Sequence, residues 1–205
     1  MVFSFAMDHG LWTMVRYKYR TQSGFHLSLQ KFLAMVISKT PSQSATIMNE
    51  LVLPNDTNTL NNLMGGRLLH WMDIVAAIAG QKHSNRTVVT ASVDSVSFNQ
   101  GIGLGDVVTL TSYVTRAFNT SMEVFIEVWC ENIPKGTRFK CNEAYYTFVA
   151  VDGNVRPISV PEIKPETEEE KIKYDGALRR RQLRLILAGR MIPEDANELK
   201  ALFMK

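Results

Sequence analysis

The sequence predicts an α+β fold, in which a five-stranded antiparallel sheet wraps around one long central helix and a helical tail follows. Three observations predict it. Residues 65–82 are apolar enough for a buried helix. The four segments after it are rich in alternating and β-branched residues and are joined by short turns, which makes the sheet antiparallel. The last forty residues carry acids first and bases later, which is typical of a charged helix.

One strand and one loop precede the helix. The run ATIMNELVLP at 45–54 is mixed and apolar and stops at a proline, which indicates a strand. Residues 54–62 are dense in turn formers and predict a loop. The helix begins at Gly65 and is apolar on every side. We therefore expect it to be covered both by the sheet and by a second copy of the chain.

Four strands are predicted after the helix, over residues 87–98, 106–117, 121–132 and 138–151. In the third of them alternate residues form one apolar face, which marks the side turned to the core. In the first, the apolar alternation changes phase, which predicts a β-bulge near residues 94–95.

The two ends differ from this core, which we place at residues 41–162. Residues 1–40 show no sustained period of 2 or 3.6, and we expect a non-core extension. It is either a basic targeting segment or sequence translated from upstream of a natural start at Met35 or Met48. Residues 163–205 are predicted to form a charged helical tail with a short last helix over 193–203. Its arginine run at 179–181 indicates a solvated helix face, with phosphate binding as the alternative.

Composition excludes several classes of function. The net charge is +3, but residues 1–40 carry five bases and one acid, so the core has no basic surface for nucleic acid. No apolar run reaches the roughly 18 residues that a membrane span requires. The two cysteines, Cys130 and Cys141, are too few and too far apart for a zinc site. We expect reduced thiols rather than a disulfide, no metal and a cytoplasmic protein.

The central helix contains an acid, Asp73, in the middle of its apolar run. An unpaired buried carboxylate costs several kcal/mol, so it either meets water or a polar partner, or serves as a base in a partly dry cleft. Gly65 and Gly66 stand at the helix start, where free amides can hold a ligand oxygen. Asn62, just before them, can hold a water or polarise a carbonyl. Together these groups suit the attack of water on an acyl group.

Several short motifs resemble one family. They are PNDTN at 54–58, NLMGG at 62–66, MD at 72–73, VVT at 88–90, Phe98, GD at 105–106 and FVAVD at 148–152. As a spaced set over residues 44–162 they resemble the hotdog-fold acyl-CoA thioesterases, in the YciA-like and brain acyl-CoA hydrolase branch. The resemblance implies hydrolysis of acyl-CoA to free acid and coenzyme A. It also implies a double-hotdog homodimer, often assembled as a trimer of dimers, with sites that use residues of both protomers.

Carried over by position, the family acid is Asp73, the polar residue before the glycine pair is Asn62, and the oxyanion-binding amide belongs to Gly66. Asp73 acts either as a general base or as a nucleophile. Asn58 is a supporting residue. The remaining substrate-binding candidates for coenzyme A are Gly65, Thr90, Arg116, Asn119, Thr120 and Ser121.

Two questions, the catalytic role and the acyl chain, stay open in the sequence. A non-catalytic acyl-CoA-binding hotdog protein, such as a sensor or regulatory subunit, is the alternative function, and it would bind acyl-CoA without turnover. We expect no cofactor, because coenzyme A is part of the substrate. The acyl chain itself is not predicted.

Overall fold

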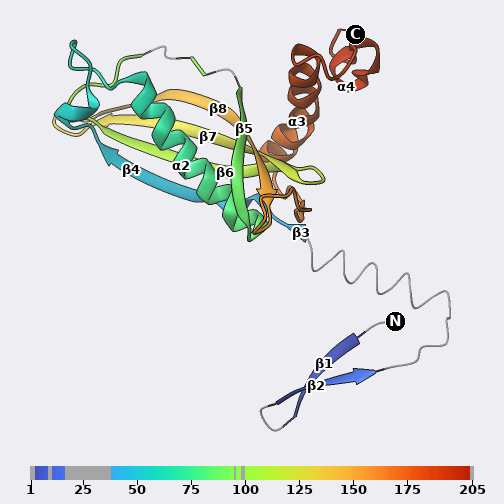
Figure 1. Ribbon diagram of the computed structural model, residues 1–205. Coiled ribbons are helices and arrows are strands. Elements are labelled where there is room, and N and C mark those ends of the chain that lie inside the picture. The colour runs from blue at the N-terminus through green and yellow to red at the C-terminus, as the bar shows by residue number, and fades with distance from the viewer. Residues whose placement is uncertain (1–2, 9–10, 17–37, 95, 98–99, 204–205) are drawn as a thin grey trace. The chain divides into compact units, whose positions relative to one another are not determined.

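The computed structural model describes residues 3–8, 11–16, 38–94, 96–97 and 100–203 (Figure 1). The chain divides into two compact units, Met1–Ile37 and Ser38–Lys205. In the first unit, β1 (Phe3–Asp8) pairs antiparallel with β2 (Leu11–Arg16), with Phe3 opposite Arg16. This hairpin was not predicted, because residues 1–40 show no sustained period of 2 or 3.6.

The second unit is built on the predicted five-stranded sheet. Its strands are β4 (Thr46–Leu51), β5 (Thr87–Asp94), β6 (Val107–Ala117), β7 (Ser121–Asn132) and β8 (Thr137–Val151). They run in the order β4-β6-β7-β8-β5, and every neighbouring pair is antiparallel. The hairpins β6–β7 and β7–β8 form the centre, and β4 and β5 are the two edges. The predicted fold class is therefore confirmed.

The helix α2 (Gly65–Ser84) lies across one face of this sheet (Figure 1). Its side chains at Met72, Val75, Ala76 and Ala79 are completely buried. They pack against inward-facing sheet residues that are also buried: Val108, Leu110, Val124, Ile126 and Phe148. The helix ends at Ser84, where Asn85 adopts a left-handed conformation that stops it. The alternating residues of the strands thus form one core with this helix.

Strand β5 contains a bulge that was not predicted. Its register with β8 shifts between Thr90 and Ser92, so Ala91 is the extra residue. The predicted bulge near residues 94–95 falls at the end of β5 and on Ser95, which lies outside the described residues. Val89 and Val93 are 42% and 45% exposed on this edge strand.

A short pair of parallel strands lies beside the C-terminal end of α2. It joins β3 (Ser38–Lys39) to β9 (Glu162–Ile163). Lys39 Nζ donates to the carbonyl of Lys82 at the end of α2, at 2.7 Å. The buried His83 ring makes a 2.8 Å hydrogen bond through Nε2 with the carbonyl of Pro161. These contacts fix the segment that leads out of the sheet into the tail.

The tail contains α3 (Glu168–Leu187), the 3-10 turn Pro193–Asp195 and the one-turn helix α4 (Asn197–Lys200). Two further 3-10 turns, Pro41–Ser44 and Pro54–Asp56, flank β4. Thr167 begins α3 with a capping box that includes Glu170. The last helix is shorter than the predicted 193–203 segment. Residues 188–196 separate it from α3, and they contain a glycine and a proline.

The tail docks on the sheet through an ion pair. Arg180 Nη2 and Nε donate to the two carboxylate oxygens of Glu123, at 2.7 and 3.0 Å, and Glu123 is completely buried. Thr115 donates a third hydrogen bond to the same carboxylate, at 2.7 Å. The prediction of a solvated arginine face was therefore wrong for Arg180, because no sequence pattern indicated that the buried acid Glu123 would lie on the outer side of β7.

Candidate active site

Asp73 is satisfied by one side chain of the neighbouring strand. Thr90 Oγ1 on β5 donates a 2.7 Å hydrogen bond to Asp73 Oδ1. Asp73 is half-buried, between the core residue Met72 and the exposed Ile74 on the same helix. It therefore stands at the border of the buried face of α2. The Asp73 charge and, more strongly, burial raise the pKa of the core residue Tyr146 to about 12.

The start of α2 presents free backbone donors. Met64 is the N-cap, and Gly65 and Gly66 are the first two helical residues. Within the described part of the chain, their two amides donate no hydrogen bond. A Cβ atom added to Gly66 would have no neighbour within 4 Å. Two donors and open space at the positive end of a helix form a place for a ligand oxygen.

The loop before the helix is held by its own hydrogen bonds. Asn58 Oδ1 accepts from the amides of Leu60 and Asn62, at 2.9 and 3.2 Å. Asp56 is buried and forms an ion pair with Arg67 Nε at 2.8 Å. Because the carboxamide oxygen of Asn58 is occupied in the loop, its exposed NH₂ group is the part left to donate to a ligand.

Asn62 plays a different part in this loop. Its side chain lies against Gly101, where an added Cβ would come within 3.3 Å of Asn62 Oδ1. Its backbone forms an isolated antiparallel bridge with Gly103. Asn62 therefore joins the loop to residues 101–103, and its half-buried carboxamide forms part of a wall.

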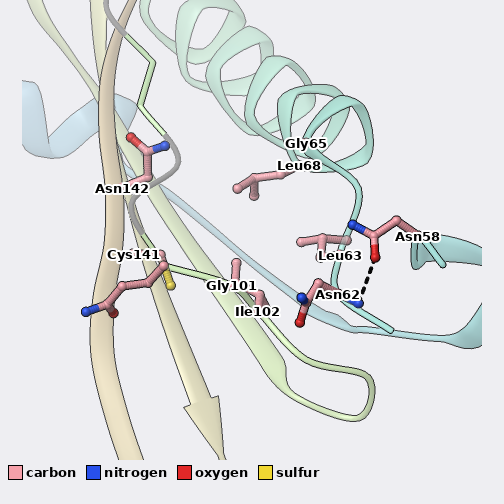
Figure 2. A pocket seen from close by; sticks show the side chains of 10 residues that line it. Asn58, Asn62, Leu63, Gly65, Leu68, Gly101, Ile102, Cys141 and Asn142 are labelled. Atoms are coloured by element: carbon pink, nitrogen blue, oxygen red, sulfur yellow. Dashed lines mark hydrogen bonds between the residues drawn. The ribbon is translucent and has the colours of Figure 1, made fainter. Parts of the chain in front are cut away.

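A cavity of about 350 Å³ opens beside the helix start (Figure 2). Residues from the loop, from α2, from residues 100–102 and from β8 surround it. They are Asn58, Asn62, Leu63, Gly65, Leu68, Gln100, Gly101, Ile102, Cys141 and Asn142. The cavity thus brings together the predicted residues Asn58, Asn62 and Gly65, with Gly66 following on the helix.

Asp73 and Thr90 do not line this cavity. Gly66 and Asp73 are seven residues apart on α2, which corresponds to about 10 Å along the helix axis. Seven residues are also close to two full turns, so both face the same side of the helix. One chain therefore holds the oxygen-binding amides and the acid on one stripe of α2, too far apart to reach the same carbon.

The coenzyme A candidates form a third group at the turn between β6 and β7. Arg116 Nη1 donates to the carbonyl of Tyr174 in α3, at 3.0 Å, and its guanidinium lies 4.1 Å from the centre of the Tyr174 ring. Asn119 Oδ1 accepts from Ser159 Oγ at 3.3 Å, and the Thr120 carbonyl accepts from the amide of Ala150.

Arg181 of α3 joins this group, and sequence reasoning missed it. Its Nη1 donates to Ser121 Oγ at 3.4 Å, and its guanidinium lies 4.4 Å from the centre of the Phe118 ring. Among the described residues neither Arg116 nor Arg181 forms an ion pair. The only sequence feature that pointed to Arg181 was the arginine run itself, since nothing in the sequence placed α3 beside this turn.

Two kinds of feature are absent from the described part of the chain. They contain no group of three His, Cys, Asp or Glu side chains that could hold a metal ion. Both cysteines are buried free thiols, as predicted. No helix among them is long and apolar enough to cross a membrane.

Comparison with known proteins identifies the family. The model of the thioesterase superfamily matches residues 60–137. An uncharacterized acyl-CoA thioester hydrolase, YkhA, of Bacillus subtilis is 43% identical over 138 residues, which cover 67% of this chain and 80% of that protein. The chain belongs to the acyl-CoA thioesterases of this superfamily. The predicted resemblance to hotdog-fold acyl-CoA thioesterases is thereby confirmed.

Solved structures of other thioesterases share the fold. A hexameric acyl-CoA thioesterase, solved without ligand, is 42% identical with a TM-score of 0.72, covering 74% of this chain and 97% of that one. The acyl-CoA hydrolase of Staphylococcus aureus, solved with butyryl coenzyme A, coenzyme A and coenzyme A disulfide, is 36% identical with a TM-score of 0.69. That match covers 75% of this chain and 95% of the other.

The Staphylococcus aureus enzyme has also been solved as three alanine variants, of an asparagine, an aspartate and a threonine. In its numbering the aspartate follows the asparagine by 15 residues, and the threonine follows the aspartate by 17. In this thioesterase Asp73 follows Asn58 by the same 15 residues, and Thr90 follows Asp73 by the same 17. Asn62 does not fit this spacing.

Proposed function

We propose that this thioesterase hydrolyses the thioester of acyl-coenzyme A to a free acid and coenzyme A, with Asp73 as the acid that activates the attack. The hydrogen bond from Thr90 to Asp73 is the observation that carries this proposal. It holds one carboxylate oxygen and leaves the other for a water or for the thioester carbon. The matching spacing of Asn58, Asp73 and Thr90 in a relative solved with coenzyme A supports the same set.

The roles follow from the donors available. The thioester oxygen accepts hydrogen bonds from the Gly66 amide and from the NH₂ group of Asn58, and both strengthen as negative charge develops on that oxygen. Asp73 takes a proton from the attacking water, or attacks directly to form an anhydride that water then cleaves. The tetrahedral intermediate collapses and expels the coenzyme A thiolate. We assign the carboxamide role to Asn58, whereas Asn62, the residue predicted for it, forms the wall beside it.

A homodimer completes this site. Because Gly66 and Asp73 lie about 10 Å apart on one helix, the acid must come from a second copy whose helix runs the opposite way. An exposed apolar surface flanks Asp73 and Thr90, formed by Ile74 and Ile78 on α2 and by Val93 on β5, which lies on the same face of the sheet as Thr90. This surface is where we place the partner. Further assembly into a trimer of dimers is supported by the hexameric relative.

The basic group at the β6–β7 turn suits the phosphates of coenzyme A. Arg116 and Arg181 are positive, with no ion-pair partner in the described chain, and the hydroxyl of Ser121 lies between strand and tail. Reversing a charge at a phosphate contact, as in Arg181→Glu, raises KM more than it lowers kcat. Unchanged kinetics for both Arg116→Glu and Arg181→Glu would remove this turn from the substrate path. Cytoplasmic localisation remains a prediction.

A thiol-release assay with a panel of acyl-CoAs tests the function. The wild-type chain releases coenzyme A, and Asp73→Ala lowers turnover by about 10²–10⁴-fold, as expected for a lost general base. The variant must bind substrate and keep the assembly of the wild type, which scattering and calorimetry show. Near-normal hydrolysis by Asp73→Ala refutes its role. Tight binding of acyl-CoA by the wild type without any release identifies a sensor instead.

A further inference from the structure

The cavity beside the helix start is not used by the mechanism above, which needs only the amide of Gly66 and the side chain of Asn58 at its edge. Gly65 lines the cavity directly. A thioester whose oxygen is held by the helix amides therefore lies at the mouth of this cavity (Figure 2). One of the two groups attached to its carbonyl carbon, the acyl chain or the pantetheine arm, then points into the cavity.

The side chains that line the cavity are polar at its rim and apolar at its floor. Asn58 and Gln100 are exposed and form the rim. Leu68, Ile102 and Cys141 are 3%, 4% and 8% exposed and form the floor. A polar rim with an apolar floor suits a group that is polar where it enters and hydrocarbon where it ends. The pantetheine arm of coenzyme A must instead lead outward to solvent, so the acyl chain is the part of the substrate that fits the floor.

The floor ends at Cys141 for a structural reason. The register of β7 with β8 shifts so that Val128 faces Asn142 while Trp129 faces Lys140, which leaves Cys141 as the extra residue of a bulge. The Asn142 side chain next to it donates to the carbonyl of Ser97 at 2.7 Å and fixes this wall. The Cys141 thiol neighbours Cys130, which is completely buried in the core, so an acyl chain that reaches Cys141 meets packed side chains.

We infer that this cavity receives the acyl chain and that Cys141 at its closed end limits the substrates to short acyl groups. The inference rests on the proposed function, and it names the substrate class of that site. The volume of about 350 Å³ is near the lower end of the range of about 300–1,000 Å³ that small-molecule sites span. Part of that volume is the polar rim, which leaves room for only a short hydrocarbon chain.

Steady-state kinetics across acyl lengths test the limit. The wild type is expected to prefer butyryl-CoA to lauroyl-CoA by about tenfold or more in kcat/KM. Cys141→Phe fills the floor, so hydrolysis of hexanoyl- and octanoyl-CoA falls by about tenfold or more while that of acetyl-CoA stays within about threefold. The matched control is Cys130→Ala, which removes the neighbouring thiol outside the cavity and changes all lengths alike. Equal losses on acetyl- and octanoyl-CoA in Cys141→Phe overturn the assignment.

Thiol labelling tests the same cavity without turnover and without depending on whether Cys141→Phe folds. On an Asp73→Asn background, which spares the substrate, methyl methanethiosulfonate transfers its methylthio group to the Cys141 thiolate and methanesulfinate leaves. Butyryl-CoA slows this labelling more than acetyl-CoA does, and Cys130 is not labelled. Equal labelling of Cys141 with and without butyryl-CoA overturns the assignment. A wild-type chain that hydrolyses no acyl-CoA refutes the proposed function, whereas protection of Cys141 would still support the cavity.

Discussion

Two inactive variants that restore activity when they pair would show that the site is built from two chains. Asn58→Ala removes a hydrogen-bond donor to the thioester oxygen, and Asp73→Ala removes the acid. The reacting carbon must lie about 3–3.5 Å from the attacking atom, whereas the helix separates Gly66 from Asp73 by about 10 Å. In a dimer with antiparallel α2 helices, a mixed pair holds one site with both groups intact and one site with neither.

The expected recovery follows from the symmetry. Coexpressed in equal amounts, the two variants pair at random, so about half of the dimers are mixed and each has one intact site of two, which gives about a quarter of wild-type activity. Each variant alone retains about one hundredth of that activity or less. The readout is the thiol-release rate, with mixed dimers quantified by native mass spectrometry.

The matched control pairs Asp73→Ala with Thr90→Ala. Because Thr90 and Asp73 contact each other within one chain, no mixed dimer of these two variants has a complete site, and no activity above that of the Thr90→Ala parent should appear. If Asn58→Ala and Asp73→Ala form mixed dimers that stay as inactive as their parents, the site is not shared in the way proposed here. Recovery in the control pair would contradict the Asp73–Thr90 assignment.

Three other changes follow from contacts in the described chain. Thr90→Val keeps the shape of the side chain but loses the hydrogen bond to the carboxylate, so kcat falls by about tenfold or more, and Thr90→Ser restores most of it in the thiol-release assay. Arg180→Met leaves the buried Glu123 carboxylate unpaired, and the free energy of unfolding in urea drops by about 3–5 kcal/mol, much of which Glu123→Gln in the same chain recovers. Burial lowers the pKa of His83 below its ordinary value of 6.5, so the unfolded chain binds the proton more tightly. The free energy of unfolding in urea therefore falls as the pH drops below 6.5, and His83→Gln should lose this part of the pH dependence.

The fold was predictable because its core leaves a periodic trace in the sequence. Met122, Val124 and Ile126 alternate along β7, and all three are completely buried against α2. The same logic failed for β5, where Val89 and Val93 are exposed in the single chain. Periodicity reports which side chains are apolar, but it does not say whether the sheet of the same chain or a second chain covers them.

The site was predictable in its chemistry but not in its grouping. An acid inside an apolar helix and a glycine pair at the helix start stand out in the sequence. Which asparagine serves them depends on hydrogen bonds that the sequence does not specify. Asn58 Oδ1 closes the loop onto Leu60 and Asn62, and this turns its NH₂ group outward. Asn62, which is nearer to the glycines in sequence, lies instead against Gly101.

Strand β5 links assembly to catalysis in this structure. It carries Thr90, which holds Asp73, and three residues later the exposed Val93 that we assign to the dimer surface. Thr90 pairs with Phe148 and Val93 pairs with Tyr146, both core residues of β8, so the bulge at Ala91 brings Thr90 and Val93 to the same face of the sheet. A straight strand would alternate strictly and would place residues 90 and 93 on opposite faces. The same edge therefore orients the acid and recruits the chain whose Asn58 and Gly66 that acid must meet.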